Sequence, residues 1–235
     1  MSRRDGILRE MGLGPIWRLR EQPAEAAAVP VAAPAADGRA AAIAAMDWDD
    51  LKTAVADCRA CGLCRARKQA VLGVGDVAAD WLFVGEGPGA EEDERGEPFV
   101  GQAGKLLDAM LAAIDLKRGE NVYIGNSVKC RPPDNRTPEP EETATCWPFL
   151  ERQIDLIKPK LIVALGRPAA QTLLQCEVKI ATSRGRLFDY RGIPVVVTYH
   201  PAYLLRNLPD KARAWEDLCF MRRTMQGLAA DKRNW

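Results

Sequence analysis

Short apolar runs alternate with stretches of helical periodicity along most of the chain. The runs have the length of buried strands, and the stretches between them repeat apolar residues at the spacing of a helix. Strands that alternate with helices predict parallel βαβ units, so we expect an α/β fold: a three-layer sandwich with a small, central, mostly parallel sheet. Pro148 predicts a break or kink in the second long helix. The expected strands are residues 81–84, 122–124, 161–165 and 195–198, and the expected helices are residues 105–114, 141–157 and 168–174.

The first 46 residues lack this alternation. Residues 21–46 hold 13 Ala and three Pro, a composition typical of a flexible linker. Residues 1–20 carry a small amphipathic cluster among five Arg, which fits a tethered docking peptide for a protein partner. A disordered leader or an Arg-rich organelle presequence fits the same pattern. We therefore predict a disordered leader and linker over residues 1–46 and a single folded domain over residues 47–235.

The composition is that of an ordinary globular protein. Of the 235 residues, 47% are hydrophobic and 28% are charged, and 33 Lys plus Arg balance 32 Asp plus Glu. This balance excludes a uniformly basic DNA-packaging protein, so any nucleic-acid site must be local. No apolar run approaches the roughly 18 residues of a membrane span, and the N-terminus lacks a signal-peptide core. Seven Cys, an odd number, favour a reducing compartment, which we expect to be the cytoplasm of a bacterium, at its nucleoid.

Ligands of such folds bind beyond the carboxyl ends of the strands, so the segments after the apolar runs are candidates for a site. The first run is followed by Gly-Glu-Gly-Pro-Gly at residues 85–89, where glycine allows positive φ angles and close approach of a ligand to the backbone. The spacing also fits a relaxed dinucleotide-binding fingerprint, but the four acids at residues 91–94 would repel a pyrophosphate. A tight structural turn is the alternative interpretation.

Two further segments after apolar runs carry polar side chains. The amide of Asn126 offers both an acceptor and donors and suits a base edge, although Asn at a strand end is also a common turn former. His200 is the only His and stands beside Pro201, where it can donate a hydrogen bond to a developing anion or serve a structural role. Leu204 and Leu205 suit a wedge between stacked bases if they lie in an exposed loop, and otherwise pack against the final helix.

Five of the cysteines have the spacing of metal ligands. Cys58, Cys61 and Cys64 form a C-x2-C-x2-C run, and Cys130 and Cys146 lie far along the chain. Four thiolates brought together by folding would hold a [4Fe-4S] cluster or a zinc ion, and spacing does not distinguish the two. The remaining two cysteines suit buried thiols without a ligand role.

Local charge is uneven along this balanced chain. Residues 58–68 hold four bases and no acid, and residues 184–213 hold six bases and two acids. Two such segments could straddle a phosphate backbone, and ordinary surface charge is the alternative.

Together these motifs resemble the family 4 uracil-DNA glycosylases, which carry an iron-sulfur cluster. The resemblance runs from Cys58 to the C-terminal helix and does not cover residues 1–46. It implies a DNA repair hydrolase that flips uracil out of single- or double-stranded DNA and cleaves its N-glycosidic bond to leave an abasic site. The motifs that carry it are residues 85–89, Pro98-Phe99-Val100-Gly101, residues 126–133 and residues 200–206.

The resemblance also implies roles for individual residues. Phe99 is expected to stack on the extruded uracil, Asn126 to read its Watson-Crick edge, and His200 to donate to the leaving uracil anion. Glu86 is the third catalytic candidate; Gly87 stands where some related families place a water-activating Asp, so leaving-group stabilisation should dominate. The remaining expected contacts are Gly85 and Gly87 in the uracil pocket, Leu204, Leu205 and Arg206 on the DNA, and Cys58, Cys61, Cys130 and Cys146 as ligands of a [4Fe-4S] cluster, with Cys64 an extra thiol.

Two other functions are compatible with parts of this pattern. A non-catalytic iron-sulfur protein of the same fold could bind nucleic acid, but the presence of Phe99, Asn126 and His200 speaks against a loss of catalysis. A relative that attaches covalently to its product through a nucleophilic His would need that His in a basic loop, and residues 129–138 contain none.

Overall fold

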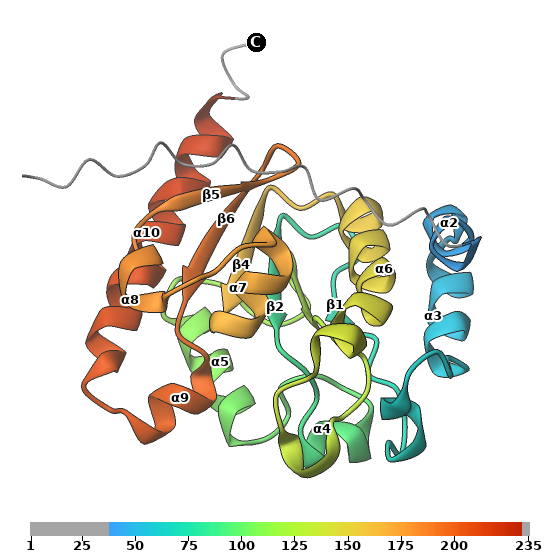
Figure 1. Ribbon diagram of the computed structural model, residues 1–235. Helices are drawn as coiled ribbons and strands as arrows, with labels where there is room; N and C mark the ends of the chain where they lie inside the picture. Colours follow the sequence, from blue (N-terminus) through green and yellow to red (C-terminus); the bar gives the residue numbers. More distant parts are fainter. Residues whose placement is uncertain (1–37, 232–235) are drawn as a thin grey trace, which may run out of the picture. The chain divides into compact units, whose positions relative to one another are not determined.

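The computed structural model describes residues 38–231, which are built around one central sheet (Figure 1). Its strands are β1 (Val74–Gly75), β2 (Trp81–Gly85), β3 (Val122–Asn126), β4 (Leu161–Leu165), β5 (Leu187–Tyr190) and β6 (Ile193–Thr198). They lie in the order β1-β3-β2-β4-β6-β5. The four inner strands run parallel, and β1 and β5 pair antiparallel at the two edges. The expected small, mostly parallel sheet is confirmed.

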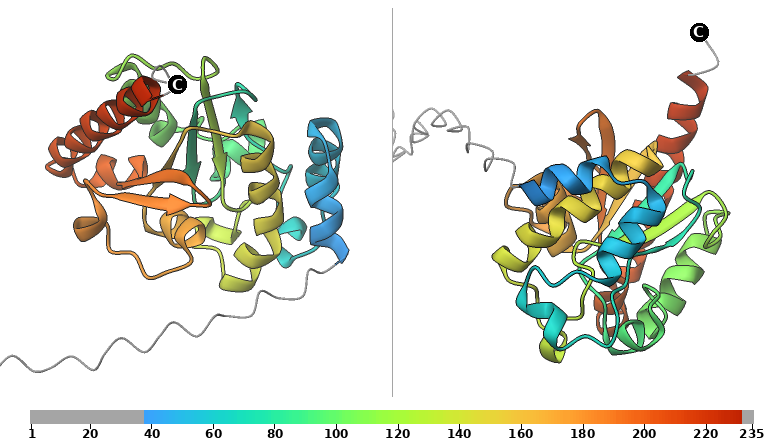
Figure 2. Two further views of the ribbon diagram at one scale, coloured as in Figure 1. Left: turned by 90° about the horizontal axis from the view of Figure 1, so that it is seen from above. Right: turned by 90° about the vertical axis from the view of Figure 1, so that its right-hand side faces the viewer.

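Helices cover both faces of this sheet, as the alternating pattern predicts (Figure 2). Strands β2, β3 and β4 are buried along their whole length because they have no solvent face, which explains their continuous apolar runs. Phe83 faces α5 and α10, whereas Leu82 and Val84 face α6 and α7. The helices are α2 (Gly38–Ala45), α3 (Trp48–Ala56), α4 (Ala90–Arg95), α5 (Gln102–Ala112), α6 (Pro140–Ile157), α7 (Arg167–Leu174), α8 (Ile180–Ser183), α9 (Pro201–Arg206) and α10 (Asp210–Asp231), with 3-10 turns η1 (Gly62–Arg65) and η2 (Pro133–Asn135). None of these helices is long and apolar enough to cross a membrane.

The expected linker over residues 21–46 is wrong for its last part, because residues 38–45 form helix α2. Alanine is the strongest helix former, and Ile43 gives the helix a buried anchor against α6. Arg39 adds a hydrogen bond from Nη1 to the carbonyl of Thr145 at 2.8 Å. The domain described by the structure therefore begins at Gly38 and not at residue 47. The docking peptide predicted in residues 1–20, and the linker as far as residue 37, lie outside the described residues.

The expected break at Pro148 is also wrong, since α6 runs unbroken from Pro140 to Ile157. Proline removes only one backbone donor, and the apolar side of this helix is fixed on both sides of Pro148. Phe149 packs in the small cluster beneath α2 and α3, and Leu150 and Ile154 pack on the sheet. Packing along the whole helix outweighs the local loss of one hydrogen bond.

Candidate functional site

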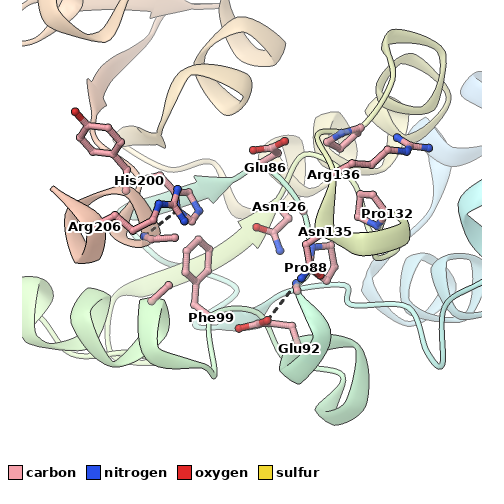
Figure 3. Close-up of a pocket in the computed structure, with 16 residues that line it drawn as sticks. Glu86, Pro88, Glu92, Phe99, Asn126, Pro132, Asn135, Arg136, His200 and Arg206 are labelled. Atoms are coloured by element: carbon pink, nitrogen blue, oxygen red, sulfur yellow. Dashed lines mark hydrogen bonds between the residues drawn. The ribbon is translucent and has the colours of Figure 1, made fainter.

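A cavity of about 420 Å³ opens at the carboxyl ends of β2, β3 and β6 (Figure 3). Three separate segments supply its polar and aromatic side chains, as expected for a parallel sheet. Of the residues singled out from the sequence, the cavity brings together Glu86, Gly87, Phe99, Asn126, His200 and Arg206.

Gly85 lies under this cavity and has no room for a side chain. A Cβ atom there would come within 2.4 Å of Asn126 Oδ1 and 2.6 Å of Phe99 Cζ. None of the glycines in residues 85–89 has a positive φ angle, so that part of the expectation is wrong. The close neighbours of Gly85 are the side chains of Asn126 and Phe99, and close approach of a ligand to this backbone stays a prediction.

Phe99 is held over the cavity by a strained backbone. Its φ angle is +54°, in the left-handed region of the backbone that residues other than glycine rarely adopt. Arg118 fixes this turn by donating from Nη1 to the carbonyl of Pro98 and from Nη2 to the carbonyl of Phe99, both at 2.8 Å. The ring centroid lies 5.4 Å from that of His200, so the two rings form neighbouring walls of the cavity.

Glu92 joins the two loops that carry these walls. Its carboxylate accepts hydrogen bonds from the backbone N–H groups of Gly89 at 3.1 Å, Val100 at 2.9 Å and Gly101 at 3.1 Å. From the sequence, Glu92 stands out only as one of a run of acids, and Arg118 does not stand out at all. The available signal was an acid three residues after Gly89 at the start of a helix, where Glu92 accepts from the Gly89 N–H.

Asn126 lies at the closed end of the cavity with 2% of its surface exposed. Its Oδ1 atom is buried and has no hydrogen-bond partner among the described residues. A buried acceptor without a donor is costly, so this atom is available to a donor group on a ligand.

His200 is held in its neutral form. Burial, together with the smaller effect of the nearby Arg206 charge, lowers its pKa to about 4, and Glu92 opposes this only in part. Its Nδ1 atom accepts a hydrogen bond from the backbone N–H of Ala202 at 3.1 Å. The single proton of the neutral ring therefore belongs on Nε2, which leaves Nε2–H as a donor.

Glu86 stands at the mouth of the same cavity and is half-buried. Burial raises the pKa of its carboxyl, and Thr137 and Arg167 partly oppose that rise. The group is suited to contact a positively charged or hydrogen-bonding part of a ligand.

The segment after His200 is helix α9 and not the exposed loop that a DNA wedge at Leu204 and Leu205 would need. Leu204 is 1% exposed and packs into the core between α5 and α10, so its predicted place at a DNA surface is wrong. Leu205 is 41% exposed and Arg206 lines the cavity, and both stay available to a partner. The helical spacing puts these neighbours on different faces.

A second, small cavity is lined by five thiols: Cys58, Cys61, Cys64, Cys130 and Cys146. Burial raises the pKa of the Cys146 thiol to about 12, so it would become a thiolate only by binding a metal. N–H groups already point at the sulfurs: Arg67 Nη1 lies 2.8 Å from Cys130 Sγ, and the Lys129 amide N lies 3.3 Å from Cys146 Sγ. Such donors are typical around iron-sulfur ligands, so the residues fit a cluster. In residues 38–231 no three His, Cys, Asp or Glu side chains are gathered as the ligands of one metal ion.

Two of the basic side chains expected to contact phosphate are engaged inside the protein. Arg67 bonds Cys130, and Arg184 forms an ion pair with the buried Asp217 at 2.9 Å. That the two segments straddle a phosphate backbone stays a prediction, and Arg67 and Arg184 are the bases least available for it. Arg59, Arg65 and Arg206 remain exposed.

Comparison with known proteins places this geometry in context. A family model described as the Uracil DNA glycosylase superfamily matches residues 72–219. The type-4 uracil-DNA glycosylase of Archaeoglobus fulgidus is 46% identical over 165 residues, which cover 67% of this chain and 82% of that protein. The type-4 uracil-DNA glycosylase of Thermotoga maritima is 48% identical over 161 residues, covering 68% of this chain and 83% of that protein.

We expect Glu92→Gln to lower the free energy of unfolding by about 2 kcal/mol, since one carboxylate oxygen becomes a donor that faces backbone N–H groups. Urea denaturation followed by circular dichroism measures this loss. The neighbouring exposed Glu91→Gln is the control and should change stability by less than about 0.5 kcal/mol. Equal stability of the two variants would contradict the role given to Glu92.

Proposed function

This chain belongs to the uracil-DNA glycosylase superfamily and to its type-4 members, and we propose that it acts through the pocket formed by Phe99, Asn126 and His200. The protein is a DNA repair hydrolase that cleaves the N-glycosidic bond of uracil in DNA, as the motifs predict. The observation that carries the assignment of the pocket is the buried Oδ1 of Asn126, which has no partner within the described part of the chain.

Recognition of uracil would depend on Asn126. Its free Oδ1 would accept N3–H of uracil, and its amide N–H would donate to O4. Cytosine has no N3–H and presents a donor in place of O4, so both contacts would fail. Each mismatched group costs roughly 1 to 3 kcal/mol, which is enough to select uracil.

Phe99 would compensate part of the cost of base flipping. A base cannot be cleaved within the stack, so the nucleotide must turn out of the DNA at a cost of a few kcal/mol. The fixed Phe99 ring offers the extruded base a new stacking partner. Leu205 and Arg206 lie on the surface beside the pocket, where they would contact the DNA that the base has left.

His200 would stabilise the leaving group. Negative charge builds on uracil as the bond to the sugar breaks, and the sugar becomes oxocarbenium-like. The Nε2–H donor of neutral His200 can bond uracil O2, and this bond strengthens as the charge grows, which lowers the barrier. Glu86 would assist by electrostatic stabilisation of the sugar cation or by orienting water.

Cys58, Cys61, Cys130 and Cys146 would hold a [4Fe-4S] cluster, with Cys64 as an extra thiol beside it. When bound, such a cluster crosslinks the chain and takes no part in bond cleavage. The four residues come from two distant parts of the chain, so a cluster bound to all four would hold residues 58–64 against α6.

We further propose that the protein works in the cytoplasm on uracil-containing DNA, single- or double-stranded. All seven cysteines are free thiols, which favours a reducing compartment.

The first measurement is uracil release from an oligonucleotide with one deoxyuridine. Wild type should release uracil, and His200→Ala should be slower by roughly 100-fold or more, the cost of a lost charge-stabilising donor. Glu86→Gln should lose clearly less activity. Equal losses in the two variants would refute the ranking, and an iron-loaded wild type that releases no uracil would favour the non-catalytic binding protein.

The single-turnover rate should stay flat from about pH 7.5 down to about pH 5.5, because neutral His200 gains a proton only as the pH falls through its lowered pKa of about 4. Protonation would put a hydrogen on Nδ1 against the Ala202 N–H and disturb α9. An inflection near pH 6.5, the ordinary pKa of His, would contradict this arrangement. Glu86→Gln is the control that separates titration of that carboxyl.

Cys58→Ser should lose iron and much of the soluble protein together, whereas Cys64→Ser should keep both. Iron content per chain and the visible absorbance of the cluster measure this difference. Cys64→Ser is a close match, because it removes a thiol from the same cavity wall. Loss of iron in Cys64→Ser with retention in Cys58→Ser would assign the ligands the other way round.

A further inference from the structure

Lys129 lines the cysteine cavity and is hydrogen-bonded to Asn126, a residue of the pocket. Its side chain is 1% exposed, and Nζ donates to the backbone carbonyl of Asn126 at 2.8 Å. Its backbone N–H points at Cys146 Sγ. Nothing in the function proposed above uses this buried amine.

The carbonyl of Asn126 needs a donor that the sheet does not supply. The N–H of Ser127 bonds the carbonyl of Gly85 in β2, so the carbonyl of the same peptide points the opposite way, toward β1. Strand β1 does not reach this carbonyl, because its pairing with β3 covers Tyr123 and Ile124 and stops before Asn126. Lys129 takes the place of the missing strand.

Gln153 holds the amine from the other side. Its Oε1 accepts from Lys129 Nζ, while its Nε2 donates to the carbonyl of Leu72 at 3.0 Å and to the hydroxyl of Tyr123 at 3.1 Å. Gln153 is fully buried on α6, the helix that also carries Cys146. The peptide group between Asn126 and Ser127 is thus joined, through Lys129 and Gln153, to the core of the domain.

We propose that Lys129 is a positioning residue that fixes the direction of the Asn126 amide and so sets how tightly the pocket reads uracil. The inference rests on the proposed function, since it concerns the same pocket. A buried ammonium with only neutral oxygen partners needs negative charge nearby, and cluster-bound thiolates at Cys130 and Cys146 would supply it.

A double-mutant cycle tests this on the full-length, iron-loaded protein. Lys129→Met keeps the length of the side chain and removes the donors, and single-turnover uracil release should slow by roughly 10- to 100-fold. The double variant Lys129→Met with Asn126→Ala should be no slower than Asn126→Ala alone, because Lys129 acts through Asn126. Iron content and a cooperative melt should be retained. Tyr123→Phe is the matched control: it removes a hydrogen bond from Gln153 on the side away from Asn126, and should stay within about twofold of wild type.

Two results would overturn the inference: a Lys129→Met rate within about twofold of wild type, or losses that multiply in the double variant, as a general structural defect would give. If Lys129→Met does not fold, Gln153→Met carries the same cycle with a smaller expected loss. An Asn126→Ala protein as active as wild type would reject the proposed pocket itself, whereas a slow Asn126→Ala beside a fast Lys129→Met would reject only the role of Lys129.

Discussion

The pocket depends on the contact between the ends of β2 and β3, where Gly85 is paired with Asn126. A side chain at Gly85 would occupy the space of both Asn126 Oδ1 and the Phe99 ring. The absence of that side chain lets a hydrogen-bonding amide and an aromatic ring meet at one corner, with a cavity above them that suits a flat base. The parallel register fixes this corner, because it brings both carboxyl ends to the same level.

The ring of Phe99 can serve as a fixed stacking surface because other residues bear the strain of its backbone. A non-glycine residue in the left-handed region costs of order 1 to 3 kcal/mol and persists only when its surroundings hold it. Arg118 bonds the two carbonyls of this turn, and Glu92 bonds the two N–H groups that follow. The cost is met on folding, so the ring would need little rearrangement when a base arrives.

Much of this architecture could be predicted from the sequence, because the inner strands are buried on both faces and their apolar runs are unmistakable. Glu86, Asn126 and His200 were found for the same reason, since they lie at or just after the ends of parallel strands, whereas Phe99 came only from the family resemblance. Edge strand β5 was missed because it is half exposed and has no such run, and α2 because an Ala-rich composition is shared by linkers and helices. Leu204 was misplaced because adjacent leucines give no sign of which one faces the core. Arg118 bonds a backbone carbonyl in a loop distant in sequence, and Lys129 bonds the carbonyl at the end of β3. No local sequence pattern predicts either contact.

The contacts of the cysteine-bearing segment give a reason why the proposed [4Fe-4S] cluster would be useful to a hydrolase. The segment before β1 shares a small third core with α6, separate from the two cores that sandwich the sheet. Yet it supports the pocket from behind: the backbone N–H of Lys68 bonds both oxygens of the buried Asp93 in α4, the helix that begins the pocket loop, and the Val71 N–H bonds the carbonyl of Lys129. A group that joins Cys58 and Cys61 to Cys130 and Cys146 would hold that segment in place without entering the reaction. The proposed cluster would then support the pocket through rigidity, because Cys130 follows Asn126 by only four residues along the chain.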